Sequence, residues 1–530
     1  MSDSKPVYFS DLAIKADIQL IHADMCVYAA TSAGIVAAIT ARRRGLTVAL
    51  LHPGDHPGGM AANGLSCTDV GNEAIIGGLT AEIFDALGSH YGLARTWRPE
   101  PHIVRRTFEQ LMADHEITPI IGQYLHRVHR DGKRIKAIEM IGGLTVTAST
   151  FLDCSYEGDL MAAADVPFTL GREGNALYGE TSNGVIVHDS HQFDHDVSPF
   201  RIENDPASGL LPDIEPSHLG PIGAGDGRIQ AYNFRVCMTA DKANRIPFPK
   251  PENYNPRRYE LCRRWLHGTS IDFFRKFDPI MGSEKTDTNN HGAFSTDLIG
   301  GSTRWPVAGY AERERIFQEH VDYQQGLHHF LAHDPSVPAT IREEYARWGL
   351  AGDEFADTGH WPPQLYIREA RRMLGDVVIT ERHCRSDVID ADVIAMGAYQ
   401  MDSHNCRRFV DTAGFVRNEG DVQIRLRRPY GISYRAITPP TDSVTNLLVP
   451  VALSASHIAF GSIRMEPVFM MLAESAAIAG HLAASQNIPV QALPYPDLEC
   501  ALKEAGQVLS CDVAMSLNDD GNPETIVESS

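Results

Sequence analysis

The chain has 530 residues and a formal net charge of −21, and its length favours two lobes that share an interface over a single core. So acidic a chain lacks the basic surface that a nucleic-acid partner requires. We also find no apolar run of the roughly 18 residues that span a membrane. We therefore expect a cytoplasmic protein that binds neither nucleic acid nor a membrane. Its nine cysteines are scattered without a Cys-x-x-Cys pair, which argues against an iron–sulfur ferredoxin, a zinc ribbon or a dithiol pair and leaves redox chemistry to an organic cofactor.

The first predicted elements form a βαβ unit. An apolar run over 23–29 predicts a strand, the periodicity of 31–44 predicts a helix, and 47–51 predicts a second strand. Further on, 134–140 and 144–147 predict a hairpin, and 150–154 predicts another strand. Regularity is lower from 185 to 364, which favours an inserted lobe, and it returns as a strand over 447–451 and a helix over 467–484.

The turn after the first strand lies where a dinucleotide-binding fold places its G-x-G-x-x-G fingerprint. In this chain the segment reads Ala29-Ala30-Thr31-Ser32-Ala33-Gly34, so only the last of the three glycines is present. The helix N-terminus still offers N–H groups and a favourable dipole to a pyrophosphate. These six residues are therefore candidates for cofactor binding, with ordinary βαβ packing as the alternative.

The end of the second strand departs from the usual pattern. An acid normally binds the ribose hydroxyls there, and this chain has His52. A neutral imidazole can accept one ribose hydrogen bond, and a surface histidine is the alternative interpretation. The next loop contains His56 and the pair Gly58-Gly59 before Met60, and glycines allow the backbone to run beside a flat ring where larger side chains would clash.

Several longer motifs extend along the chain. They are Thr31-x-Ala33-Gly34, His56-x-Gly58-Gly59-Met60, Thr68-Asp69-Val70-Gly71-Asn72, Asp153-Cys154-Ser155-Tyr156-Glu157-Gly158-Asp159, Gly171-Arg172-Glu173, Tyr232-Asn233-Phe234-Arg235, Trp361-Pro362-Pro363-Gln364, Asp402-Ser403-His404, Ser454-Ala455-Ser456-His457 and Gly461-Ser462-Ile463-Arg464-Met465-Glu466-Pro467. With these motifs the chain resembles the FAD-dependent oxidoreductase family, some of whose members carry the label xanthan lyase. The resemblance covers nearly the whole chain, to about residue 510.

The resemblance implies an α/β fold in which a Rossmann-like, glutathione-reductase-like FAD-binding domain carries an inserted α+β substrate domain. We expect the FAD-binding domain to comprise 1–185 and 386–510, the inserted domain 186–385, and a disordered tail 511–530. It also implies FAD as the cofactor, with Ala29 to Gly34, His52, His56, Gly58, Gly59 and Met60 among its contacts. Whether a histidine links covalently to the flavin stays open.

Three carboxylates join the cofactor candidates through the resemblance. Asp153 and Glu157 follow a strand beside the adenosine end, where the alternative role is capping of the helix that Asp159 begins. Glu466 and Pro467 begin a helix whose N–H groups would point at the flavin and stabilise its reduced form.

Two histidines are candidate bases. His457 precedes the C-terminal helix and is the first candidate to take a proton while hydride leaves to flavin N5. His404 is the second, because it alternates with Asp402 and an extended segment would place both on one side as an acid–histidine pair. A buried structural pair is the alternative.

Four further residues are candidates for substrate binding. Arg464 suits an anionic group, and Tyr430, Tyr434 and Arg435 offer hydroxyl and guanidinium groups, with aromatic packing or a loop network as the alternative.

Two charged groups need a separate interpretation. A helix is predicted over the charged residues Arg368, Glu369, Arg371 and Arg372. Their side chains would form either a solvated face of this helix or a clamp for an anionic group. His188, His191, Asp194 and His195 look like metal ligands, but prolines follow and the family implies no metal there, so we expect none.

Together these features predict an FAD-dependent oxidoreductase that takes a hydride from a small polar substrate, with a sugar-like alcohol as our guess. Dioxygen or a soluble acceptor would reoxidise the flavin, because no second nucleotide fingerprint follows a strand. The alternatives are an NAD(P)H-driven flavin reductase, and a flavoprotein with structural FAD that acts as a lyase or binds a partner. Assembly into a homo-oligomer stays open.

Overall fold

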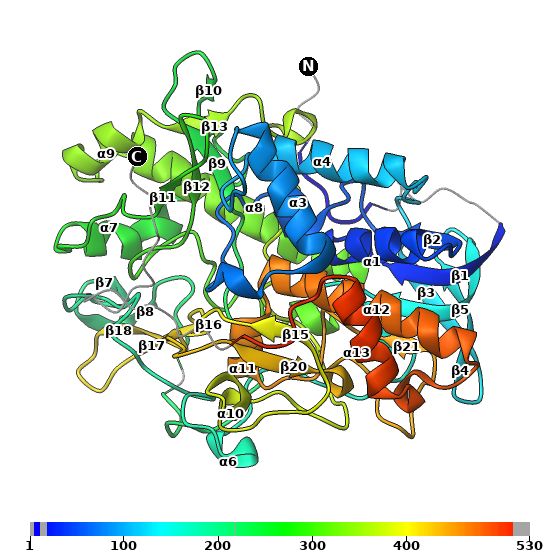
Figure 1. Ribbon diagram of the computed structural model, residues 1–530. Helices are drawn as coiled ribbons and strands as arrows, with labels where there is room; N and C mark the ends of the chain where they lie inside the picture. The colour runs from blue at the N-terminus through cyan, green and yellow to red at the C-terminus, as the bar shows by residue number, and fades with distance from the viewer. Residues whose placement is uncertain (1–4, 11–18, 217, 512–530) are drawn as a thin grey trace.

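The computed structural model describes residues 5–10, 19–216 and 218–511, and its main sheet has the strand order β2-β1-β5-β4-β3, with β21 paired to β5 (Figure 1). The strands are β1 (Leu20–Tyr28), β2 (Val48–Leu51), β3 (Leu125–Asp131), β4 (Arg134–Met140), β5 (Thr145–Asp153) and β21 (Leu447–Leu448). β1, β2, β5 and β21 run parallel. Tyr28 is level with both Leu51 and Asp153, so the residues that follow β1, β2 and β5 meet at one edge of the sheet.

Both faces of this sheet are covered. Met25 and Val27 of β1 point into a core shared with α1 (Ser32–Arg43) and α12 (Glu466–Ser485), whereas Cys26 and Tyr28 point into a second core with β3, β4 and α5 (Asp159–Ala163). α1 and α12 pack against each other, next to α3 (Gly78–His90) and α4 (Pro101–Asp114) (Figure 1). Burial on both faces explains the continuous apolar runs of the parallel strands.

The structure confirms the predicted βαβ unit, the hairpin and the C-terminal helix, and it corrects two strands. The segment 150–154 is the second half of β5, which stays extended beside β1 from Thr145 to Asp153. The strand predicted over 447–451 is only two residues long, because β21 pairs with β5 solely at Leu447 and Leu448.

Helix α12 also corrects the expectation that no apolar run is long enough to cross a membrane. By its length and composition this 20-residue helix meets the requirement, and it is the one such helix in the described part of the chain. Most of it is buried inside the protein, where it packs on α1 and β5. Its apolar sequence is therefore accounted for by its place in the core.

The second lobe is built on an antiparallel sheet with the order β10-β13-β9-β12-β11. Its strands are β9 (Val236–Thr239), β10 (Arg245–Ile246), β11 (Phe277–Pro279), β12 (Lys285–Thr288) and β13 (Gly349–Ala351), and its helices are α7 (Glu260–Leu266), α8 (Tyr310–His333) and α9 (Ala339–Tyr345). This α+β lobe lies within the segment predicted to be inserted. The domain boundaries at 185 and 385 stay predictions.

The remaining helices and strands are short. The helices are α2 (Gly59–Ala62), α6 (Asn175–Tyr178), α10 (Glu381–Cys384), α11 (His457–Ile463) and α13 (Tyr495–Glu504). The strands pair as β6 (Phe168–Thr169) with β14 (Arg372–Met373), β7 (Phe200–Ile202) with β8 (Asp205–Leu210), β15 (Val393–Gly397) with β20 (Tyr430–Ser433), β16 (Met401–Ser403) with β19 (Val422–Ile424), and β17 (Arg407–Val410) with β18 (Val416–Glu419). Apart from Cys511, the predicted disordered tail lies outside the described residues.

The helix predicted around Arg368 is wrong. Residues 363–371 form a non-helical connection that enters β14. Tyr366 donates its N–H to Asn233 O at 2.9 Å, and the Arg368 guanidinium donates to Asn233 Oδ1 at 3.0 Å. These bonds to the segment before β9 replace the bonds within a helix, and they bury arginines that helical periodicity places on a solvated face.

The carboxyl group of Glu474 on α12 gives the fold a pH dependence. Glu474 is 4% exposed and accepts hydrogen bonds from Leu79 N at 2.9 Å and Gln507 Nε2 at 2.6 Å. Burial raises its pKa from 4.5 to about 7. An acid whose pKa is raised on folding stabilises the native state below its unfolded pKa, and this contribution is lost as the pH rises through the folded pKa.

We therefore expect the ionisation of Glu474 to lower the free energy of unfolding as the pH rises from 4.5 to about 7. The decrease should be on the order of 1–3 kcal/mol. The variant Glu474→Gln keeps the acceptor but does not ionise, so its free energy of unfolding should fall less over this range. Urea unfolding at pH 5, 6, 7 and 8 measures the difference. Parallel pH profiles for the two proteins would contradict the assignment.

Candidate active site

The edge where β1, β2 and β5 end forms a recess suited to a nucleotide. Its lining includes Ala29 and Thr31 after β1, His52 after β2, and Glu157 after β5. His52 is 6% exposed, and its Nδ1 atom has no hydrogen-bond partner within the described chain. Burial lowers the pKa of His52 to about 4, so its imidazole is neutral at physiological pH and keeps a lone pair for a hydroxyl donor.

Glu157 lines the same recess as His52. Its carboxyl accepts a long hydrogen bond of 3.4 Å from Tyr8 Oη, and burial raises its pKa above the usual value. Tyr8 and Val7 of the N-terminal segment also line the recess, and the segment is tied down by a bond from Tyr8 N to Glu314 at 2.8 Å. The N-terminal segment thus forms one wall of the recess.

The first turn of α1 has the geometry of a phosphate site. Thr31 caps the helix: its hydroxyl accepts from Gly34 N at 3.3 Å and donates to Cys154 O at 2.8 Å. A Cβ atom on Gly34 would overlap the carbonyl oxygen of Ala29. This is the close helix–strand contact that the third glycine of the fingerprint serves, so the surviving glycine is the one that sterics require.

The glycine pair lies against this turn. Gly58 N donates to Ala30 O at 2.8 Å, and Gly58 and Gly59 have φ angles of 107° and 57°. A Cβ on Gly59 would overlap the Tyr156 hydroxyl, which accepts from Met60 N at 2.8 Å. The backbone of this loop therefore approaches α1 in a way that side chains would prevent.

Glu466 connects the C-terminal part of the chain to the N-terminal part at this turn. Its carboxyl accepts from Ser32 Oγ in the first turn of α1 and from Tyr156 Oη at 2.7 Å. Burial raises its pKa to about 7. The N-termini of α1 and α12 are thereby held together. The residues fit FAD, because His52 and Glu157 would meet the adenosine, the turn from Ala29 to Gly34 would meet the pyrophosphate, and the start of α12 would lie beyond it.

Two predicted cofactor residues have other partners. Asp153 accepts from Ser155 N, Ser155 Oγ and Met161 N, which is the capping role of its alternative interpretation, and burial raises its pKa to about 7. His56 lines the recess, and its Nε2 pairs with Asp357 at 2.9 Å.

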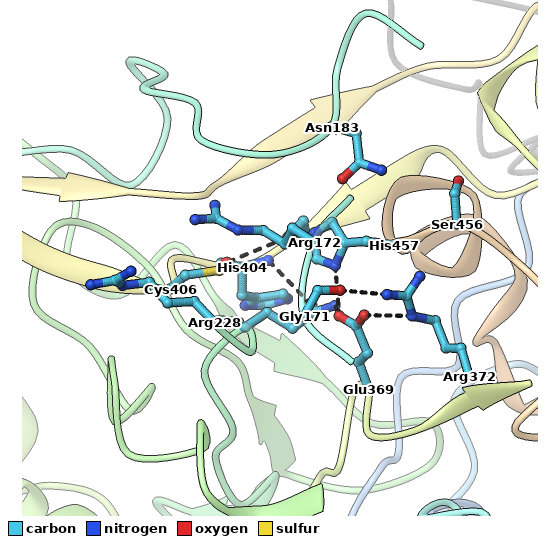
Figure 2. A network of polar contacts seen from close by, with 12 residues as sticks. Gly171, Arg172, Asn183, Arg228, Glu369, Arg372, His404, Cys406, Ser456 and His457 are labelled. Carbon is cyan, nitrogen blue, oxygen red and sulfur yellow. Dashed lines mark hydrogen bonds and ion pairs between the residues drawn. The ribbon is translucent and has the colours of Figure 1, made fainter. Parts of the chain in front are cut away.

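The first candidate base, His457, has both ring nitrogens engaged. Its Nδ1 lies 2.7 Å from Glu369 Oε2 (Figure 2), and its Nε2 lies 2.9 Å from Ser403 Oγ. Glu369 also pairs with Arg372 Nε at 2.9 Å. His457 is 2% exposed and lies inside this network.

The second candidate, His404, forms the predicted pair with Asp402 on β16. Its Nε2 lies 3.4 Å from Asp402 Oδ2, and its Nδ1 lies 2.7 Å from Asp297 Oδ2. Burial alone would raise the pKa of Asp402, but the hydrogen bond to His404 and the charge of Arg464 hold it below its usual value. The alternation of residues along an extended segment predicted this contact correctly.

Arg464 is the centre of a cluster of polar side chains that we call the Arg464 cluster: Arg464, Asp402, Tyr366, Tyr399 and Asp69. Arg464 pairs with Asp402 and donates to Tyr366 Oη at 3.1 Å. The charge of Arg464 lowers the pKa values of both Tyr399 and Asp69, and the charge of Asp402 raises them. Sequence reasoning proposed Arg464 and Asp402 but missed the other three, of which Asp69 lies in a quoted family motif.

The remaining substrate candidates have their polar groups engaged elsewhere. Tyr430 Oη donates to Ser462 Oγ at 2.8 Å, and Tyr434 Oη donates to Val490 O at 2.8 Å. Arg435 is half-exposed and pairs with Asp392 at 3.0 Å and Asp390 at 3.2 Å. These contacts favour the packing and loop-network alternatives.

The histidine-rich segment does not converge on one point. His191 pairs with Asp421 at 2.8 Å, whereas Asp194 accepts from Trp265 Nε1 and Ser270 N. Another group in the described chain has metal-ligand spacing, namely Glu100, His102, Asp353 and Glu354. The ammonium group of Lys285 lies within 2.8 Å of three of these carboxylates and supplies the positive charge there.

Parallel strands, an apolar first helix and a nucleotide recess at the strand ends define a protein with a dinucleotide-binding α/β fold. The model of the family "FAD dependent oxidoreductase" matches residues 24–502, so the chain belongs to this family and its cofactor is FAD. No curated protein matches it.

Solved structures of flavoproteins resemble limited parts of the chain. A flavin monooxygenase mutant from Stenotrophomonas maltophilia is 16% identical over 25% of this chain and 38% of that one, with a TM-score of 0.20. Thioredoxin reductase from Streptococcus pyogenes is 19% identical over 25% of this chain and 34% of that one, with a TM-score of 0.18. Sdh1 of Mycobacterium smegmatis in complex with UQ1 is 13% identical over 30% of this chain and 42% of that one, with a TM-score of 0.22. The chain thus covers less than half the length of each.

A methyl group on Gly34 should disrupt the turn after β1. In Gly34→Ala the overlap with Ala29 O forces the backbone apart, so we expect loss of FAD binding and a lower melting temperature. Gly309→Ala is the matched control, because a Cβ there meets nothing within 4 Å and φ is −73°. Flavin absorbance and thermal unfolding measure both effects, and normal FAD content in Gly34→Ala would contradict the assignment.

Removal of the His52 imidazole should remove one hydrogen bond to FAD. The loss should weaken the affinity for FAD roughly five- to tenfold. Because the pKa of His52 is about 4, the effect should be the same at pH 6 and pH 8. Titration of the apoprotein with FAD compares His52→Ala with His126→Ala, an exposed histidine on β3. Equal affinities in the two variants would show that His52 does not contact the cofactor.

Proposed function

We propose that this FAD-dependent oxidoreductase removes a hydride from a small polar substrate, with a sugar-like alcohol as the first candidate. A base on the chain takes the accompanying proton, and dioxygen or a soluble acceptor reoxidises the cofactor. FAD supplies the two-electron acceptor at its N5 atom. Oxidase and dehydrogenase variants of this reaction differ only in the final acceptor.

The Arg464 cluster is the observation that supports this proposal. Arg464 lies two residues before Glu466, whose carboxyl contacts the first turn of α1. The cluster is therefore close to the N-termini of α1 and α12, which would face the cofactor. Guanidinium, carboxyl and phenol groups there suit a substrate rich in hydroxyl groups, because each hydroxyl both donates and accepts hydrogen bonds.

The two histidines hold this cluster in place. His404 fixes Asp402, and Asp402 in turn orients Arg464. His457 binds Ser403, the residue between Asp402 and His404. The His404 side chain is 10% exposed and that of His457 is 2%, so His404 is the more accessible of the two.

Anaerobic mixing with sugars and polyols tests the proposal. We expect the yellow holoprotein to be bleached by at least one of them. Arg464→Lys should slow this bleaching about tenfold or more, because an ammonium group cannot keep the two bonds to Asp402 and Tyr366 in one plane. Arg435→Lys is the matched control and should leave the rate unchanged.

The wild-type result decides the substrate class. A holoprotein that is bleached by none of the sugars and polyols would contradict this proposed function. Equal rates in Arg464→Lys and wild type would contradict the role of the Arg464 cluster.

A further inference from the structure

We propose that Asp69 is the residue that takes the proton from the substrate hydroxyl, and that Tyr399 binds the same substrate beside it. This inference rests on the proposed function and names a catalytic residue for it. It replaces the two histidines in the role that the sequence suggested for them.

The loop that carries Asp69 is fixed at both ends. Before Asp69, the N–H groups of Ser66 and Cys67 donate to Asp287 Oδ2 at 2.9 and 2.7 Å, and Asp287 Oδ1 binds Arg235 Nε at 2.7 Å. After Asp69, Gly71 has a φ of 80°, and a Cβ there would overlap the backbone of Ala398. Asp69 is thus held between Arg235 and the segment that carries Tyr399.

The carboxylate of Asp69 is both reachable and without a partner. Asp69 is half-buried, and no hydrogen bond or ion pair joins it to any other residue between 19 and 511 that the structure describes. Neither of its oxygens is among the fully buried atoms that lack a partner, so each keeps some exposed surface. The hydroxyl of Tyr399 shows the same combination.

The buried arginines of this region each pair with a carboxylate other than Asp69. Arg464 has Asp402 as its partner, Arg235 has Asp287, and Arg368 has Asp297 at 3.1 Å. Burial raises the pKa of Asp69 and the nearby charge of Asp402 adds to this, while Arg235, Arg464 and Lys276 oppose it. The net result is a pKa above the usual value, which makes the carboxylate a stronger base than an exposed aspartate.

The histidines lack what a base needs. A proton acceptor must present a lone pair to the substrate, and each ring nitrogen of His457 and of His404 already has a protein partner. Asp69 has free lone pairs, and solvent can remove the proton afterwards. An exposed loop carboxylate with no role is the alternative, and it does not explain why the loop is fixed at both ends.

The step balances as an alcohol oxidation. The O–H bond of the substrate breaks and its proton goes to an oxygen of Asp69, while the C–H bond of the same carbon breaks and its electron pair leaves with the hydrogen to the N5 atom of FAD. A C=O bond forms, so the substrate loses two electrons and FAD gains them. Asp69 then releases its proton to water.

The test compares Asp69→Asn with wild type and with Asp114→Asn, which removes an exposed carboxyl on α4. With a polyol that bleaches the wild-type holoprotein, we expect Asp69→Asn to be bleached on the order of 100-fold more slowly or worse. FAD affinity and melting temperature should stay near those of wild type. Asp69→Glu should recover part of the rate.

The pH profile adds a readout that a structural role would not change. The bleaching rate of wild type should fall on the acid side as Asp69 is protonated, and Asp69→Asn should lack this fall. Equal rates and profiles in the two proteins would overturn the inference and leave the proposed function standing. Retention of the acid-side fall in Asp69→Asn, together with its loss in His404→Asn, would assign the proton to His404 instead. A wild-type protein that no polyol bleaches would contradict the proposed function itself.

Discussion

The interior of the protein depends on ion pairs that join buried arginines to carboxylates, most of which come from distant segments. A buried charge without a partner is strongly destabilising, by several kcal/mol, so such pairs determine which segments become neighbours. The pairs are Arg172 with Asp226 and Glu419, Arg235 with Asp287, Arg313 with Asp159, Arg368 with Asp297, Arg372 with Glu173 and Glu369, and Arg464 with Asp402. Arg408 lies over the ring of Phe294, and no carboxylate among the described residues pairs with it. Against this pattern the accessible, unmatched carboxylate of Asp69 is what would be expected of a group that meets a substrate.

The turn after β1 tolerates its unusual sequence because sterics require a glycine at one position of the fingerprint. Gly34 contacts Ala29 too closely for any side chain, whereas the two lost glycines stand where Ala29 and Thr31 fit. Thr31 even adds a cap to α1 and a bond to Cys154. With His52 in the place of the ribose acid, a neutral acceptor would replace a charged one, and Glu157 supplies a carboxyl in the same recess.

Local patterns predicted the local structure well, and long-range pairing explains what they missed. Periodicity and glycine placement were enough for the βαβ unit, the hairpin and α12, and strand alternation was enough for Asp402 with His404. The helix expected around Arg368 failed because periodicity cannot detect that Asn233 lies 135 residues away in sequence and within hydrogen-bond distance. Tyr434 and Arg435 look like pocket residues until Val490 and Asp392 are known to be their partners. Asp69 stood inside a recognised motif, but its role depends on Arg235 and Tyr399, which only the fold brings near.

The alternation of β16 separates two roles within three residues. Asp402 and His404 lie on one side of the strand, where they orient Arg464, while Ser403 points the other way to His457 at the start of α11. Glu369 then ties His457 to Arg372, and through it to β14. A histidine with both nitrogens bonded is well suited to hold such a frame and poorly suited to accept a proton from a substrate. The frame therefore fixes Arg464 rigidly, and the acid–base step falls to a group on a neighbouring loop whose oxygens remain free.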